Sequence, residues 1–93
     1  MEAMMFNPPH PGTVLKDYLE GHTLTDVAAH LGVSRNSLVR VVHGKAGISA
    51  AMSLKLGEAL GTSVDFWFKM QNQYDFWIAS QGKRKTVPRL NAA

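Results

Sequence analysis

Residues 22–43 read HTLTDVAAHLGVSRNSLVRVVH and contain two short amphipathic helical patterns joined by a tight turn. Thr23 precedes the first pattern, which runs over 24–30, and Ser34 begins the second. Both are residue types that cap helix N-termini. Gly32 lies between the patterns and can adopt the positive φ that a turn between crossed helices often needs. The stretch therefore predicts a helix-turn-helix, a motif that usually places its second helix in the DNA major groove.

Three further helices are expected around this motif. Their apolar residues recur with the helical period, whereas no stretch alternates as a strand would. The first is expected to end near Gly21, the fourth to run from a Ser49 cap to Gly61, and the fifth to begin after Thr62 or Ser63 and reach Ser80. The sequence thus predicts an all-α fold in one domain. Its expected parts are an extended arm over 1–11, the helical domain over 12–80, and a basic, flexible, disordered tail over 81–93.

Composition limits the classes of function open to the chain. It has 93 residues, no cysteine and a net charge of +3, which suits one small domain with a mildly basic surface. No apolar run has the length of a membrane span, so we expect a cytoplasmic protein with no membrane partner. The four histidines are scattered, and no triad, phosphate loop or paired carboxylate is present. We therefore expect no enzymatic activity, no metal and no cofactor.

The second helix of the motif carries side chains suited to DNA. From Gly32 to Lys45 there is no acidic residue. Asparagine pairs with adenine, arginine with guanine, serine with either, and valine contacts the thymine methyl group. The expected base-reading residues are Arg35, Asn36, Ser37, Val39 and Arg40, and the expected phosphate contacts are Thr23, Ser34, His43 and Lys45. The alternative is that this polar face is only solvated, as exposed helix faces usually are.

The chain resembles the HigA-type antitoxins of toxin–antitoxin modules, within the Xre/Cro-like helix-turn-helix family. The matching segments are Phe6-Asn7-Pro8-Pro9-His10-Pro11-Gly12, Leu31-Gly32-Val33-Ser34-Arg35, Gly44-Lys45-Ala46-Gly47-Ile48-Ser49, Phe66-Trp67 and Tyr74-Asp75-Phe76-Trp77. The resemblance implies a lambda-repressor-like domain of five helices that binds its own promoter as a dimer. It also implies a partner toxin that cleaves messenger RNA.

The fifth helix carries more apolar side chains than one packed face requires. Tryptophan, tyrosine, phenylalanine and methionine are also the types enriched at interface centres. We therefore expect one side of this helix to pack on the first and fourth helices and another side to form a twofold contact. A homodimer of this kind would suit a palindromic operator. The residues expected in the contact are Trp67, Tyr74, Trp77 and Ile78; the alternative is that all of them are internal core.

Two other functions remain compatible with the sequence. The chain could be a stand-alone or phage-derived repressor with no toxin. Alternatively, its helix-turn-helix could be a protein-interaction module that no longer binds DNA, in which case Asn36 and Arg40 would not matter for binding.

Overall fold

The computed structural model describes residues 7–82 and 84–91, which contain five helices and no strand. The helices are α1 (Pro11–Tyr18), α2 (Leu24–Leu31), α3 (Arg35–Val42), α4 (Ala50–Leu60) and α5 (Phe66–Gln81). The all-α, five-helix fold predicted from the sequence is confirmed. Residues 1–6 of the predicted arm, and 83 and 92–93 of the predicted tail, lie outside the described residues. The tail over 84–91 has neither helix nor strand, and its side chains are exposed.

Local capping sets the start of each helix in the motif and of α4. The Thr23 hydroxyl accepts a hydrogen bond from the Asp26 N–H, and the Ser49 hydroxyl accepts one from the Met52 N–H. Ser34 caps α3 in the same way. Gly32 ends α2 in the left-handed conformation, with φ of 73°. These caps satisfy backbone groups that two eight-residue helices would otherwise leave unpaired, as the sequence predicted.

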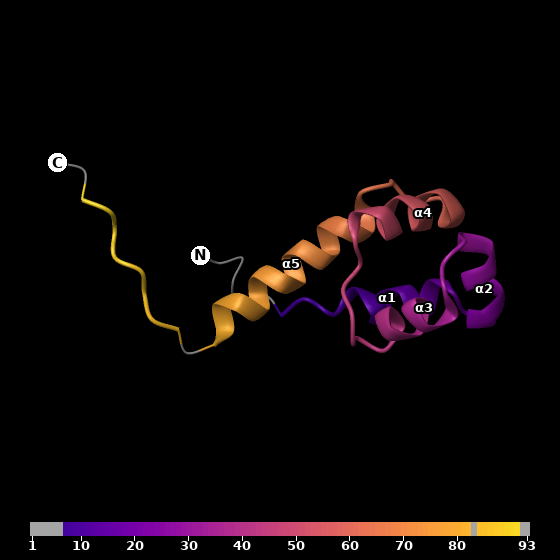
Figure 1. Ribbon diagram of the computed structural model, residues 1–93, viewed down its shortest axis with the longest axis horizontal. Helices are drawn as coiled ribbons and strands as arrows, with labels where there is room; N and C mark the ends of the chain where they lie inside the picture. The colour runs from indigo at the N-terminus through magenta and orange to yellow at the C-terminus, as the bar shows by residue number, and fades with distance from the viewer. Residues whose placement is uncertain (1–6, 83, 92–93) are drawn as a thin grey trace.

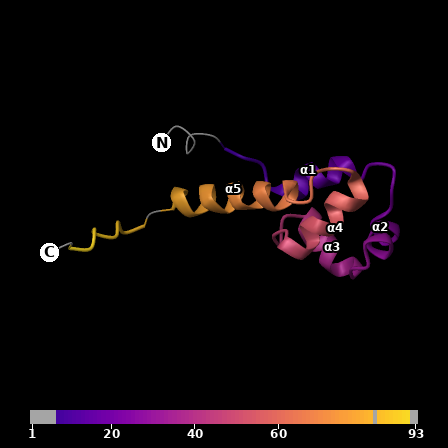
Figure 2. The same cartoon turned by 90° about the horizontal axis from the view of Figure 1, so that it is seen from above.

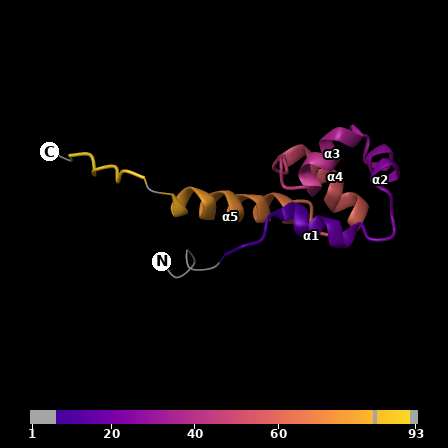
Figure 3. The ribbon, with the colours of Figure 1, turned by 90° about the horizontal axis from the view of Figure 1, so that it is seen from below.

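Helices α1 to α4 form a compact group from which α5 projects (Figure 1). α3 packs against α1 and α2, while the first part of α5 packs against α1 and α4. Figures 2 and 3 show the second half of α5 extending past the group, with the tail beyond it. The predicted packing of α5 on the first and fourth helices is therefore observed. Among the described residues, no helix is long and apolar enough to span a membrane.

Trp67 lies at the centre of the core and is completely buried. Its indole N–H donates to the Thr62 hydroxyl at 3.1 Å, and the Tyr18 and Phe66 rings pack edge-on against it. A side chain with no exposed surface cannot contact a second copy. The prediction that Trp67 belongs to a dimer interface is therefore wrong, because the residue supplies core packing between α5 and α1. The other core residues are Leu15, Leu19, Ala28, Leu31, Leu38, Val41, Val42, Ile48, Met52 and Leu56.

α5 begins at Phe66, later than the sequence indicated. Its N-cap residue, Asp65, makes no capping hydrogen bond with its side chain. The buried Ser53 of α4 takes that role instead: its hydroxyl accepts from the Phe68 N–H at 3.0 Å and donates to the Val64 carbonyl oxygen at 2.7 Å. α1 also differs slightly, since it ends at Tyr18 rather than near Gly21.

The described part of the arm packs against the domain. Pro8 is buried, and His10 is the N-cap of α1, where its Nδ1 accepts from the Gly12 N–H at 2.9 Å. The His10 ring also meets the Tyr74 ring edge-on, with 4.9 Å between centroids. Gly12 lies directly against the Val41 carbonyl, so that α1 crosses close to α3. His10 thus links α5 to the start of α1.

Candidate nucleic-acid interface

The predicted base-reading residues lie along α3, on the side away from α1. Arg35, Asn36, Ser37 and Arg40 are exposed, and Val39 is half-buried. Leu38, Val41 and Val42 hold the opposite side in the core. Helix α3 therefore presents a polar surface whose backbone is fixed by its own apolar face.

Ser34 and Ser37 form a closed pair at the start of α3. The Ser37 N–H donates to the Ser34 hydroxyl at 3.0 Å, and that hydroxyl donates to the Ser37 hydroxyl at 2.8 Å. The Ser37 hydroxyl keeps its own proton for an external acceptor. The cap thus orients Ser37 before any ligand arrives.

Both arginines of α3 are held by hydrogen bonds to neighbouring elements. Arg35 Nε donates to the Thr25 hydroxyl of α2 at 3.0 Å. Arg40 Nη2 donates to the Lys45 carbonyl oxygen at 3.2 Å, across the loop that follows α3. Each guanidinium retains further N–H donors, because arginine carries five. No side-chain hydrogen bond of Asn36 occurs among the described residues.

The four predicted phosphate-contacting residues are all exposed but are spread over three places. Thr23 is at the start of α2 and Ser34 at the start of α3, where both hydroxyls already accept capping N–H groups. His43 is the C-cap of α3, and Lys45 follows in the loop.

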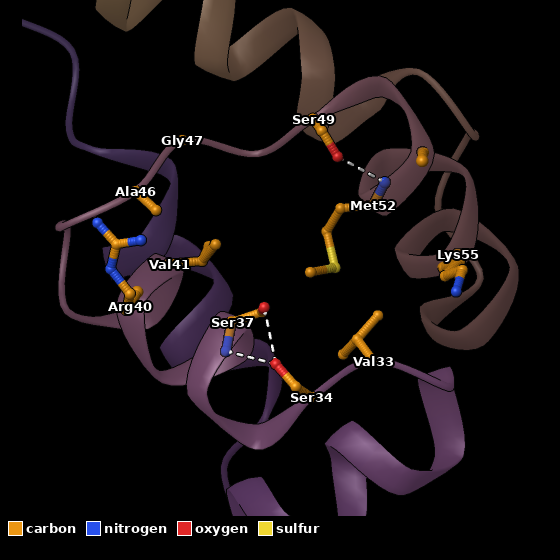
Figure 4. A pocket seen from close by; sticks show the side chains of 11 residues that line it. Val33, Ser34, Ser37, Arg40, Val41, Ala46, Gly47, Ser49, Met52 and Lys55 are labelled. Atoms are coloured by element: carbon orange, nitrogen blue, oxygen red, sulfur yellow. Dashed lines mark hydrogen bonds between the residues drawn. The ribbon is translucent and has the colours of Figure 1, made fainter.

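A hollow of about 420 Å³ separates the N-termini of α3 and α4 (Figure 4). Met52 points into it, with Val33 and Val41 beside it. Its polar lining is Ser34, Ser37, Arg40, Ser49 and Lys55. Lys55 Nζ donates to the Gly32 carbonyl oxygen at 3.4 Å, which links α4 to the turn of the motif.

Thr25, Ser49 and Lys55 were not among the residues predicted for the site. Ser49 and Lys55 lie beyond the helix-turn-helix in sequence. They come close to it because α4 packs on α2 and faces α3 across the hollow. The sequence could have indicated Thr25, because this residue is near the start of α2 and the turn of the motif brings the starts of α2 and α3 together.

The charge of this surface is positive. No acidic residue occurs between Asp26 and Glu58, a range that includes all of α3 and most of α4. In the described part of the chain, the one ion pair joins Lys69 to Asp65 at 3.0 Å and belongs to α5. Lys45 and Lys55 are therefore not neutralised by carboxylates, which suits contact with a polyanion.

The packing around the His10 ring changes its pKa. Partial burial lowers the pKa of His10 below its ordinary value, and the Asp75 carboxylate opposes this shift more weakly. The neutral ring is the form that accepts the Gly12 N–H. In the described residues, no three histidines or carboxylates are grouped as metal ligands would be.

The remaining residues of the predicted dimer contact lie on the outer half of α5. Tyr74 and Trp77 are half-buried, while Ile78 is 47% exposed. Phe76, which the sequence did not assign to the contact, is 65% exposed. An apolar surface therefore remains on α5 after Trp67 is removed from the predicted set.

Comparison with known proteins places the chain in a family. The model of the helix-turn-helix (HTH_3) family matches residues 15–67. Virulence-associated protein A' of Dichelobacter nodosus is 43% identical over 74 residues, which is 76% of this chain and 64% of that relative. Antitoxin HigA-1 of Vibrio cholerae is 34% identical over 73 residues, covering 75% of this chain and 69% of the antitoxin.

Solved structures show the same likeness. A HigA-family addiction module antidote protein from Coxiella burnetii is 30% identical and superposes with a TM-score of 0.74, covering 80% of this chain and 84% of that one. Pseudomonas aeruginosa antitoxin HigA, solved with the higBA promoter, is 33% identical with a TM-score of 0.74, covering 77% and 82%. The chain therefore belongs to the helix-turn-helix family and, within it, to the group that contains the HigA-type antitoxins.

Proposed function

We propose that this chain is a sequence-specific DNA-binding antitoxin that represses its own operon and neutralises a toxin that cleaves messenger RNA. The observation that carries the DNA-binding part is the surface of α3. Its polar side chains are exposed, no carboxylate lies near them in sequence, and three are already held in place by hydrogen bonds. A face that is only solvated needs none of these tethers.

On DNA, α3 would lie in the major groove with its N-terminal half nearest the base edges. Asn36 would pair with adenine, and Arg35 and Arg40 with guanine, while Val39 would contact a thymine methyl group. Thr23, Ser34, His43 and Lys45 would contact phosphates. Lys55 joins this set because it lines the same hollow as Ser34.

Two copies would pair through the outer half of α5, using Tyr74, Trp77, Ile78 and the exposed Phe76. A twofold contact would present two α3 helices to half-sites about 34–36 Å apart on a palindromic operator. The support is the apolar surface that α5 retains after its first half has packed on α1 and α4.

Binding to the promoter DNA of the chain's own operon tests the first part, measured by fluorescence anisotropy over a salt series. We expect selective binding by the wild type and loss of selectivity in Asn36→Ala/Arg40→Ala. The matched control is Arg89→Ala/Asn91→Ala, which removes the same residue types from the exposed tail and should leave selectivity unchanged. Equal binding of the wild type to scrambled DNA would refute sequence-specific repression.

Growth rescue tests the toxin part. The neighbouring small reading frame would be expressed alone and together with this chain, and messenger RNA integrity followed in both cases. Arrest relieved by co-expression supports an antitoxin. Promoter binding without any toxic neighbour would support a stand-alone repressor instead, as the sequence also allowed.

Sedimentation tests the dimer. Ile78→Asp should shift the chain toward monomer, whereas Leu54→Asp, at a similarly exposed position on α4, should not. Trp67 is unsuitable for this test because its replacement would disturb the core. An unchanged dimer in Ile78→Asp would place the interface elsewhere.

A further inference from the structure

Thr25 and Arg35 form a side-chain hydrogen bond between the two helices of the motif. The Thr25 hydroxyl accepts from Arg35 Nε at 3.0 Å, and both residues are exposed. They are ten residues apart, so the contact exists only because the turn at Gly32 brings the starts of α2 and α3 together. An exposed hydrogen bond of this kind contributes little to folding, which leaves its role open.

The bond acts on one particular atom of the guanidinium. With Nε occupied, arginine cannot pair with a base through the Nε edge. The two terminal nitrogens remain available for base pairing. In the end-on arrangement, one donates an N–H to guanine O6 and the other donates an N–H to guanine N7. Holding the long side chain beforehand also reduces the ordering that binding would require.

We propose that Thr25 is a positioning residue that holds Arg35 for end-on pairing with a guanine in the operator. This inference rests on the proposed DNA-binding function. Thr25 itself contacts no base in this arrangement; it acts through Arg35. It thereby determines how strictly the protein requires guanine at one base pair of each half-site.

The test compares variants on a set of operators that differ from the chain's own promoter site by single base pairs. The variants are Thr25→Val, which keeps the shape but loses the hydroxyl, Thr25→Ser, which keeps the hydroxyl, Arg35→Ala, and the double variant Thr25→Val/Arg35→Ala. Thr25→Val should lose about fivefold in preference for guanine at one position, a part of what a bidentate pair provides. Thr25→Ser should retain the preference, and the double variant should match Arg35→Ala.

Three outcomes would overturn the inference. A loss that is equal on every operator variant would mean that Arg35 contacts a phosphate. A Thr25→Val effect that persists in the Arg35→Ala background would mean that Thr25 does not act through Arg35. An unchanged preference would mean that the hydrogen bond has no part in recognition.

A measurement without DNA separates this inference from the proposed function. The Nε–H signal of Arg35 in a nitrogen-15 NMR spectrum should exchange slowly with water in the wild type and in Thr25→Ser, and rapidly in Thr25→Val. Rapid exchange in all three would refute the positioning contact itself. Slow exchange in a wild type that binds no DNA selectively would instead refute the proposed function, and the role in guanine recognition with it.

Discussion

Replacing Gly57 by alanine tests how tightly α4 packs on the segment that leads into α5. Gly57 is buried within α4 and lacks a positive φ, so an alanine would suit its backbone. A methyl group there, however, would lie 2.6 Å from the Val64 Cα and 2.8 Å from the Ser63 carbonyl oxygen. Both are backbone atoms, which no side-chain rotation can move away.

Two effects of opposite sign decide the outcome. In an unobstructed helix, glycine to alanine stabilises by about 1 kcal/mol. Here the 63–64 segment must retreat, and overpacking of this kind costs about 1–3 kcal/mol. The retreat also pulls the Val64 carbonyl away from the Ser53 hydroxyl that now donates to it at 2.7 Å, a loss of about 1 kcal/mol. We expect a net destabilisation of about 2 kcal/mol, or about 10 °C in melting temperature for a domain of this size.

Thermal and urea unfolding, followed by circular dichroism, would measure the change. Gly82→Ala is the matched control, because nothing lies within 4 Å of the added methyl group, and it should unfold like the wild type. A Gly57→Ala variant more stable than the wild type would refute the reasoning, since the helix preference would then outweigh the contact.

Three further variants test other contacts. Gln71→Leu should cost about 1–3 kcal/mol in urea unfolding, because it leaves the buried Ile48 N–H without its side-chain acceptor; an unchanged midpoint would contradict this. Gly12→Ala should lower the melting temperature by bringing a methyl group against the Val41 carbonyl, and unaltered melting would exclude the close crossing of α1 and α3. The lowered pKa of His10 means that its neutral form favours the folded state, so this stability is present above pH 6.5 and is lost as the pH falls below it. His10→Asn should keep the cap and show a weaker loss of stability on acidification; an equal loss would assign the pH dependence to other groups.

The sequence was sufficient to predict the helix-turn-helix because the signals that define it are local. Thr23 and Ser34 each cap an N–H only three residues ahead. Gly32 ends α2 at the position where the two helical patterns meet. Each of these contacts can be recognised without knowing the rest of the fold.

The start of α5 and the role of Trp67 depended on distant residues. Ser53 replaces the missing cap of α5 from fifteen residues away, on another helix. Trp67 belongs to a residue type that serves cores and interfaces equally well, so composition alone could not assign it. Only the packing of α5 on α1 and α4 decides that it is internal.

The candidate site, too, could be predicted from the sequence only in part. The exposed polar face of α3 follows from the helical period, and its predicted residues lie there. The tethers on Arg35 and Arg40 depend on how α2 and the following loop are placed in three dimensions. Helical periodicity therefore predicts which residues share this face but not which of their atoms are already engaged.

The bond between Gln71 and the loop after α3 has a consequence for how the protein opens. Gln71 Oε1 accepts the Ile48 N–H at 2.9 Å, while its own amide donates to Asp75 further along α5. Ile48 lies outside every helix, yet its amide proton should exchange with solvent deuterium much more slowly than an exposed loop proton, although faster than protons in the helical core. It can exchange only when α5 separates from this loop. The exchange rate of the Ile48 amide proton therefore reports how often α5 undocks, and it can be measured separately from the rate of global unfolding.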